Sequence, residues 1–404
     1  MGMSCGETTV EIMDSAELRE LLSAEGLALL DSLPRFESSS DVVRSVADLR
    51  RAGHSPALVA AVLRQSRLRS RATAKFGPFA ERMLFTEAGL EQATRLTVAA
   101  HHADRFRRAA ITRVADLGCG IGADALALAA LDIDVVAVER DEVTAAVAVY
   151  NLAPWPNARV EHADAESFEL SSFGGVYLDP ARRDTKRKLR NPSDWSPTLD
   201  FAFDLASRHP TGIKLSPAAD RSLIPADAEA QWVSHAGDVV ELGLWFGALA
   251  RDGVRRSALV LTAEGSAELT AGADSLDEPT GALGDFVYEP NGAVIRARLI
   301  GDLARRLNAR MLDPSIAYLT ADAPSSSPFA SCFRIIERMP LSTKPIARAL
   351  RARGIGTLEI KKRGVDIDPA EFRTSLGLRG EASATLILTR VAGKRTALIT
   401  ERMS

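Results

Sequence analysis

The segment Val114-Ala115-Asp116-Leu117-Gly118-Cys119-Gly120-Ile121-Gly122 carries the strongest structural signal in this sequence of 404 residues. Its apolar beginning, residues 114–117, predicts a short buried strand, and residues 123–131 predict a helix. Glycines between a strand and a helix let the backbone turn tightly and approach a ligand where a Cβ would collide. In open α/β sheets such a loop lies beyond the carboxyl end of its strand, where ligands bind.

Strands and helices alternate after this segment. Further strands are predicted at residues 135–138, 160–162, 176–178 and 212–215. A helix is predicted at 144–151, and this alternation is typical of a parallel sheet with helices on both faces. Residues 239–246 and 258–262 lack a long helix between them, which predicts an antiparallel pair that closes the sheet. Residues 264–292, rich in Gly, Ala, Asp and Pro, predict a loop or linker.

The chain is predicted to contain three domains. Residues 1–110 form a helical domain, in which Ser55-Pro56 starts one helix. Residues 111–320 contain the sheet and the linker. The run Ala-Asp-Ala-Pro-Ser-Ser-Ser-Pro at 321–328 marks the next boundary, and residues 321–404 form a small α+β domain.

The formal net charge of −3 conceals a separation of charge along the chain. Residues 1–110 hold 15 Lys and Arg against 14 Asp and Glu, a net +1. Residues 111–330 hold 20 against 32, a net −12, and residues 331–404 hold 15 against 7, a net +8. The total argues against a strongly basic nucleic-acid binder, whereas the basic tail taken alone does not.

The composition excludes several classes of protein. A hydrophobic content of 46% excludes a disordered chain, and no apolar run approaches the roughly 18 residues of a membrane span. The acidic N-terminus lacks the pattern of a secretion signal. Cys5, Cys119 and Cys332 are too few and too scattered for a disulfide framework or a zinc site. We therefore expect a cytoplasmic protein that binds no metal and no membrane.

Acidic residues follow the predicted strands. Asp116 precedes the three glycines, and Glu139 ends the second strand 17 residues after Gly122. A carboxylate at that place can accept hydrogen bonds from both ribose hydroxyls of a nucleoside. Asp164 follows the third strand, and Asp179 follows the fourth.

In order and separation, these features over residues 114–183 resemble the class I S-adenosylmethionine-dependent methyltransferases. The resemblance implies a Rossmann-like α/β sheet, with S-adenosylmethionine as cofactor and the glycine loop around its methionine part. It places Glu139 on the ribose, Asp164 on the adenine amino group and Asp179 at the transferable methyl. The implied cofactor-binding residues are Asp116, Leu117, Gly118, Cys119, Gly120, Gly122, Glu139, Arg140, Asp164, Ala165 and Asp179. The alternative, a nicotinamide or flavin enzyme on a similar sheet, leaves Asp164 and Asp179 without a role.

The sequence Asp179-Pro180-Ala181-Arg182 resembles the Asp/Asn-Pro-Pro-aromatic motif of methyltransferases that act on exocyclic amines of bases. The resemblance implies that Asp179 and Pro180 are catalytic, with Asp179 orienting the nucleophile. Ala181 and Arg182 replace the second proline and the aromatic ring, so a base would have to stack elsewhere. Methylation at uridine C5 needs a cysteine after the fifth strand, and residues 213–217 (Ile-Lys-Leu-Ser-Pro) contain none.

Two basic segments predict contacts with phosphates. Residues 182–190 place six basic side chains against one acid directly after the catalytic strand, and a solvated loop is the alternative interpretation. The second segment is Lys361-Lys362-Arg363 in the basic tail. The predicted substrate-binding residues are Arg182, Arg183, Lys186, Arg187, Lys188, Lys361, Lys362 and Arg363.

The order of the domains resembles bacterial methyltransferases with a C-terminal THUMP-like domain. THUMP domains bind RNA in tRNA-modifying enzymes, so the resemblance implies an RNA partner. We expect methylation of a base nitrogen in tRNA or rRNA, on a base that is flipped or single-stranded. Two alternatives stay open: a nucleic-acid-binding protein with a methyltransferase fold and little activity, and a methyltransferase for small molecules or proteins.

Overall fold

The computed structural model describes residues 13–33, 39–180, 183–184, 187–188 and 195–403. Its internal contacts divide the chain into two units. The first comprises residues 1–214 and 245–249, and the second comprises residues 215–244 and 250–404. The expected division into three domains, with boundaries at 110 and 320, stays a prediction.

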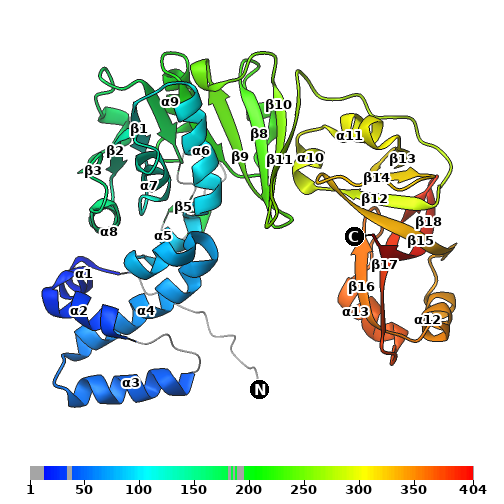
Figure 1. Ribbon diagram of the computed structural model, residues 1–404, viewed down its shortest axis with the longest axis horizontal. Helices are drawn as coiled ribbons and strands as arrows, with labels where there is room; N and C mark the ends of the chain where they lie inside the picture. Colours follow the sequence, from blue (N-terminus) through cyan, green and yellow to red (C-terminus); the bar gives the residue numbers. More distant parts are fainter. Residues whose placement is uncertain (1–12, 34–38, 181–182, 185–186, 189–194, 404) are drawn as a thin grey trace. The chain divides into compact units, whose positions relative to one another are not determined.

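Helices dominate the first part of unit 1 (Figure 1). They are α1 (Ser15–Leu22), α2 (Ala24–Ser32), α3 (Ser39–Arg51), α4 (Pro56–Phe76), the 3₁₀ turn η1 (Gly77–Arg82), α5 (Glu87–Gln92) and α6 (Leu96–Arg108). Ser55 caps α4 by accepting a hydrogen bond from the backbone N–H of Leu58, and Pro56 occupies the first turn. The predicted helical N-terminal part is therefore confirmed.

The rest of unit 1 is a parallel sheet covered by helices (Figure 1). Its strands are β1 (Arg113–Leu117), β2 (Asp134–Glu139), β3 (Ala158–His162), β4 (Gly175–Leu178) and β7 (Thr211–Leu215). Its helices are α7 (Ala123–Ala129), α8 (Glu142–Leu152) and α9 (Leu199–Ala206), with the turn η2 (Ala165–Ser167). The strands lie in the order β7-β4-β1-β2-β3, and neighbouring strands in this order pair in parallel.

This strand order confirms the predicted α/β sheet and locates its ligand-binding edge. The chain leaves β1 toward β2 and β3, then returns to place β4 on the other side of β1. Connections therefore diverge at the carboxyl ends of β1 and β4, which is where open α/β sheets form their ligand crevice. The glycine loop follows β1, and Asp179 follows β4, so both belong to this edge.

Unit 2 begins with four strands in the order β11-β10-β8-β9. They are β8 (Glu229–His235), β9 (Asp238–Phe246), β10 (Arg256–Thr262) and β11 (Gly265–Ala271). The predicted antiparallel pair of 239–246 with 258–262 is wrong, because β10 pairs in parallel with β8 and antiparallel with β11. The sequence did not predict β8 and β11, which are the two strands that pair with β10.

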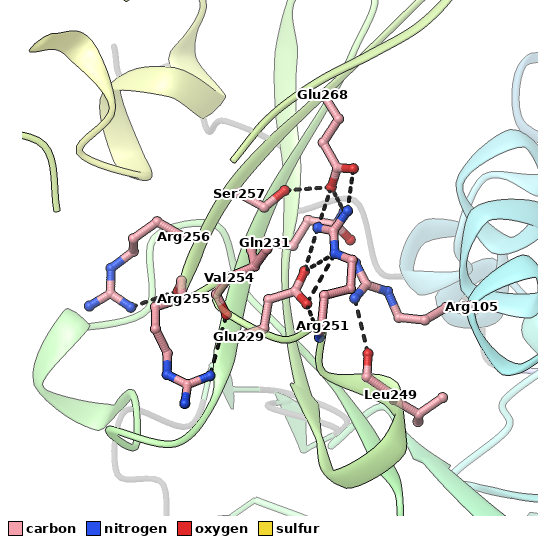
Figure 2. A network of polar contacts seen from close by, with 10 residues as sticks. All are labelled: Arg105, Glu229, Gln231, Leu249, Arg251, Val254, Arg255, Arg256, Ser257 and Glu268. Carbon is pink, nitrogen blue, oxygen red and sulfur yellow. Dashed lines mark hydrogen bonds and ion pairs between the residues drawn. The ribbon is translucent and has the colours of Figure 1, made fainter. Parts of the chain in front are cut away.

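A buried ion-pair network joins these strands (Figure 2). The Arg251 guanidinium lies 2.6 Å from Oε1 of Glu229, which is fully buried, and 2.6 Å from Oε2 of Glu268. Ser257 and Gln231 also donate to Glu268, at 2.6 and 2.5 Å. Burial alone would raise the pKa of Glu268, but these donors outweigh it and lower that pKa from 4.5 to about 2.

The second sheet of unit 2 has seven strands in the order β13-β14-β12-β15-β18-β17-β16. They are β12 (Phe286–Pro290), β13 (Arg310–Asp313), β14 (Ile316–Ala321), β15 (Ala330–Pro340), β16 (Ile355–Lys362), β17 (Ala382–Val391) and β18 (Lys394–Arg402). The helices are α10 (Gly292–Arg296), α11 (Ile300–Leu307), α12 (Thr343–Ala352) and α13 (Pro369–Leu376). Strands on both sides of residues 321–328 therefore share one sheet. The predicted loop at 264–292 is confirmed only for residues 272–285 and is wrong for the rest, since β11 and β12 both lie within it.

The described residues include neither a membrane-spanning helix nor a group of metal-binding side chains. In the described part of the chain, no helix combines the length and apolarity required to traverse a lipid bilayer. Among the same residues, no group of three or more histidine, cysteine or acidic side chains could hold a metal ion.

Candidate functional site

The glycine loop forms a backbone cradle at the end of β1. Gly118, Gly120 and Gly122 have φ angles of +80°, +55° and +85°. Residues with a Cβ rarely adopt this left-handed backbone conformation. The N–H groups of Gly118 and Cys119 donate to the carbonyl of Val138 in β2 at 2.9 and 3.1 Å, which fixes the start of the loop. A Cβ on Gly120 would have no atom within 4 Å, so this position borders open space.

Glu139 joins the end of β2 to this loop. Its carboxylate accepts hydrogen bonds from the N–H of Gly120 at 3.1 Å and from the N–H of Asp141 at 2.9 Å. Burial raises the pKa of Glu139, and the two backbone donors oppose that rise. The structure therefore brings together the predicted ribose-binding acid and the predicted methionine-binding loop. Arg140, which follows, is exposed.

Asp164 lies beyond the end of the neighbouring strand, β3. The backbone N–H of Ala163, directly before it, donates to the carbonyl of Glu139 at 3.2 Å. Asp164 is exposed, and it caps the turn that begins at Ala165 by accepting from the N–H of Glu166 at 2.8 Å. The predicted adenine-binding acid therefore follows the predicted ribose-binding acid along one edge of the sheet.

Asp116 is a buried carboxylate at the base of the loop, only 1% exposed. Burial raises its pKa well above the usual value, and the charges of Asp124 and Asp179 add to that effect. Within the described residues, its Oδ2 atom has no hydrogen-bond partner. A buried carboxylate oxygen of this kind calls for a donor, and the methionine part of S-adenosylmethionine carries an ammonium group. The cradle at Gly120 and this oxygen fit the cofactor that the resemblance implies.

Asp179 follows β4 and is held by a lysine. Its Oδ2 atom contacts Nζ of Lys214 in β7, and this ammonium also donates to Oγ1 of Thr94 at 2.9 Å. Asp179 keeps 32% of its side-chain surface exposed, whereas Lys214 keeps 14%. Pro180, the other predicted catalytic residue, is buried.

The hydrogen bonds continue from Thr94 into the core of unit 1. The Thr94 hydroxyl donates to Oδ2 of Asp124 at 2.7 Å, and Oδ1 of Asp124 lies 2.8 Å from Nδ1 of His102. The Tyr177 hydroxyl lies 2.9 Å from the same ring nitrogen. Burial alone would raise the pKa of Asp124, but His102, Lys214 and Thr94 outweigh it and lower that pKa.

The sequence does not predict this network. It predicts a strand at 212–215 and shows that residues 213–217 contain no cysteine, but it assigns no role to Lys214 or His102. One signal was available: Lys214 is a charged residue in the otherwise apolar strand Ile213-Lys214-Leu215. Asp124 is likewise the one charged residue in the otherwise apolar helix α7, whereas Thr94 has no such signal in the sequence.

Cys119 is not suited to act as a nucleophile. Burial raises the pKa of its thiol well above the usual value, which disfavours the reactive thiolate. In the predicted phosphate-binding loop, Arg182, Lys186 and Arg190 lie outside the described residues. The structure describes only the backbone of the other predicted contacts: β5 (Arg183–Asp184) pairs antiparallel with β6 (Arg187–Lys188), and the role of the loop stays a prediction.

The predicted basic tail is partly neutralised. Lys361 lies 2.6 Å from Oε2 of Glu289 and 3.4 Å from Oε1 of Glu359. The guanidinium of Arg363 lies 5.2 Å from the centre of the Tyr318 ring, whereas Lys362 is exposed. Close to the ends of α12 and α13 lies a cavity of about 570 Å³, lined by Arg351, Gly354, Ile355, Gly377, Arg379 and Gly380.

Two segments of the chain match known protein families, and most of the chain matches a known protein. Residues 330–402 match the family described as THUMP domain-like, and residues 14–72 match a domain of unknown function. An uncharacterized S-adenosylmethionine-dependent methyltransferase of Mycobacterium tuberculosis, found in strains CDC 1551 / Oshkosh and H37Rv, is 32% identical over 333 residues. The match covers 80% of this chain and 90% of that protein.

A solved structure shares the fold of the whole chain. It is the crystal structure of a protein from Porphyromonas gingivalis W83 that is provisionally identified as a methyltransferase. The two chains superpose with a TM-score of 0.72 at 22% identity, over 98% of this chain and 100% of that one.

Proposed function

This chain belongs to the S-adenosylmethionine-dependent methyltransferases, and from that premise we propose that it methylates a base nitrogen in tRNA or rRNA. The family, the fold class and the cofactor expected from the sequence are confirmed. The RNA substrate rests on one observation above all, the match of residues 330–402 to the THUMP domain-like family.

The cofactor is held by the edge of the unit 1 sheet. The open space at Gly120 in the glycine loop receives the methionine part, and the unpartnered oxygen of Asp116 accepts from its ammonium group. Glu139 accepts from the ribose hydroxyls, and Asp164 accepts from the adenine amino group. The hydrogen bond between Glu139 and Gly120 supports these roles, because it couples two parts of the same site.

Asp179 orients the nucleophile. When bound, S-adenosylmethionine supplies a methyl group that passes from sulfur to the base nitrogen as the S–C bond breaks, leaving S-adenosylhomocysteine. Asp179 accepts a hydrogen bond from the substrate amine, which directs the nitrogen lone pair toward the methyl group. The nitrogen then loses a proton to solvent. Asp179 does not remove that proton beforehand, since a neutral amine already carries the lone pair that attacks.

Charge supports an RNA partner. Residues 331–404 carry a net +8, and the cavity near α12 and α13 contains Arg351 and Arg379. RNA phosphates favour such arginine-lined surfaces. Lys361 contributes less than the sequence suggests, because two glutamates already neutralise it.

The activity is tested on RNA from a strain that lacks the gene. With labelled S-adenosylmethionine, we expect the protein to methylate this RNA and not RNA from the parent strain. Mass spectrometry of nucleosides should show one methylated base restored. Asp179→Ala should abolish transfer and keep the affinity for S-adenosylhomocysteine within a fewfold, measured by calorimetry. Binding of the cofactor with no methylation of either RNA would contradict the proposal and favour a nucleic-acid-binding protein with a methyltransferase fold and little activity.

The RNA surface is tested by point variants in the full chain. Lys362→Ala with Arg379→Ala should weaken binding of total tRNA. The salt dependence of binding should also fall, by about 0.7 to 0.9 in log–log slope for each phosphate that the protein no longer neutralises. Arg334→Ala is the matched control, because Arg334 is exposed on β15 and lies 2.6 Å from Glu401. Equal effects of the control and the double variant would contradict a specific phosphate surface.

A further inference from the structure

Lys214 lies beside Asp179, the carboxylate proposed to orient the nucleophile. Its Nζ atom contacts Oδ2 of Asp179, the carboxylate that follows β4, and donates to Thr94 at 2.9 Å. Only 14% of the Lys214 side chain is exposed, so water screens this ammonium weakly. The contact therefore neutralises much of the charge that Asp179 would otherwise present.

The position of Lys214 is fixed from behind. Thr94 precedes α6, and its hydroxyl passes the hydrogen bond on to Asp124 in α7 at 2.7 Å. Asp124 in turn lies 2.8 Å from His102 in α6. Thr94, Asp124 and His102 are each at most 7% exposed, so the chain of hydrogen bonds that ends at Lys214 is set in the packed interior.

The surrounding charges are mostly negative. Asp116 and Asp124 face the Asp179–Lys214 pair from β1 and α7, and both feel the charge of Lys214. Lys75 at the end of α4 is the next ammonium, and it donates to the backbone carbonyls of Leu90, Glu91 and Ala93 at 2.7 to 2.8 Å. Among the described residues, Lys214 thus contacts a carboxylate at this edge of the sheet, whereas Lys75 contacts backbone carbonyls.

We propose that Lys214 is a positioning residue that holds Asp179 and cancels its charge toward the methyl donor. This inference rests on the proposed function, because it requires Asp179 to face the transferable methyl. S-adenosylmethionine carries a positive sulfonium, whereas S-adenosylhomocysteine has a neutral sulfur. An uncompensated carboxylate would bind the sulfonium of the reactant and so stabilise the ground state, which slows transfer. The paired carboxylate keeps an oriented acceptor for the substrate amine without that cost.

The test compares the affinities of the two cofactor forms and needs no RNA. Calorimetry on the full chain at pH 7, where burial leaves the pKa of Lys75 at about 8 and the group charged, gives the Kd of S-adenosylhomocysteine divided by the Kd of S-adenosylmethionine. Lys214→Met should raise this ratio by about tenfold, because the carboxylate loses the ammonium that contacts it and attracts the sulfonium more strongly. Asp179→Asn should lower it, because the ammonium loses the carboxylate that it contacts. The double variant should return toward the parent ratio.

Two further variants separate charge from damage to the fold. Lys214→Arg keeps the charge and should keep the parent ratio. Lys75→Met removes a nearby ammonium that contacts carbonyls rather than a carboxylate, and it should change the ratio less than about twofold. Thermal unfolding identifies any variant that has lost its structure. A variant that binds both cofactor forms more weakly by the same factor leaves the ratio of the two Kd values unchanged.

The outcomes distinguish this inference from its premise. An unchanged ratio in Lys214→Met, with a lower ratio in Asp179→Asn, would overturn the role of Lys214 and leave Asp179 at the methyl group. Unchanged ratios in both variants would remove Asp179 from the methyl group and overturn the premise as well. An equal rise in Lys75→Met and Lys214→Met would show a general field effect and also overturn the proposal.

Discussion

Arg251→Met should destabilise unit 2, because it removes the guanidinium that two glutamates share. Glu229 is fully buried and Glu268 is 25% exposed, so water solvates Glu268 in part and Glu229 not at all. Figure 2 shows the contacts of the Arg251 guanidinium to both carboxylates. The lowering of the Glu268 pKa from 4.5 to about 2 corresponds to about 3 kcal/mol in favour of its charged form. Ser257 and Gln231 supply part of this, and Arg251 is itself 38% exposed. We therefore expect the free energy of unfolding to fall by about 2 to 3 kcal/mol.

The loss should depend on pH in a defined direction. Glu268 has a folded-state pKa below its unfolded value, so its contribution to stability is present above pH 4.5 and disappears as the pH falls toward 2. The difference in stability between the parent and Arg251→Met should therefore be largest near pH 7. It should narrow between pH 4.5 and pH 2.

Urea unfolding followed by tryptophan fluorescence measures this difference, since Trp232 lies buried in β8 beside the network. Arg334→Met is the matched control: Arg334 is 53% exposed and its partner Glu401 is 60% exposed, so its loss should cost less than about 1 kcal/mol. A cost of Arg251→Met no larger than that of the control would refute a stabilising role for the buried network. A gap that stays constant from pH 7 to pH 3 would refute the assignment to Glu268.

Three further predictions concern unit 1. Glu139→Ala should weaken S-adenosylhomocysteine binding by calorimetry about tenfold to a hundredfold, because a charged acceptor is lost, whereas Glu142→Ala should leave it unchanged. Gly118→Ala should cost about 1 to 2 kcal/mol in thermal unfolding, because φ is +80°; an unchanged melting temperature would contradict the strain. Lys75→Met should lower stability by about 1 to 3 kcal/mol, since three carbonyls lose their donor, and Lys75→Arg should restore part of it.

The ligand-binding edge could be predicted because its determinants are local in the sequence. The strands β1, β2 and β4 of unit 1 each contain a short apolar run, and these runs end at one edge of the sheet. An acid or glycine directly after a run must therefore lie at that edge, as Gly118, Glu139 and Asp179 do. The glycines of the loop predict a tight backbone turn, and their positive φ angles in the structure agree with that prediction.

The support behind that edge could not be predicted. Thr94 and Lys214 are 120 residues apart, and only the packing of α6, α7 and β7 brings their partners together. The sequence does not distinguish a polar residue that is buried and hydrogen-bonded from one that is exposed to solvent. Strands β8 and β11 were missed for a related reason: their polar residues Glu229 and Glu268 are accommodated by Arg251, a partner in another segment.

The shared sheet of residues 286–402 has a consequence for how this part of the chain can be divided. β12 pairs with β14 on one side and with β15 on the other, so a fragment starting at 330 would leave the outer edge of β15 bare. An exposed strand edge recruits other chains and promotes aggregation. The matched family segment, residues 330–402, is therefore not expected to be an autonomous folding unit. A dissection of this protein that aims at an isolated RNA-binding fragment should begin before Phe286.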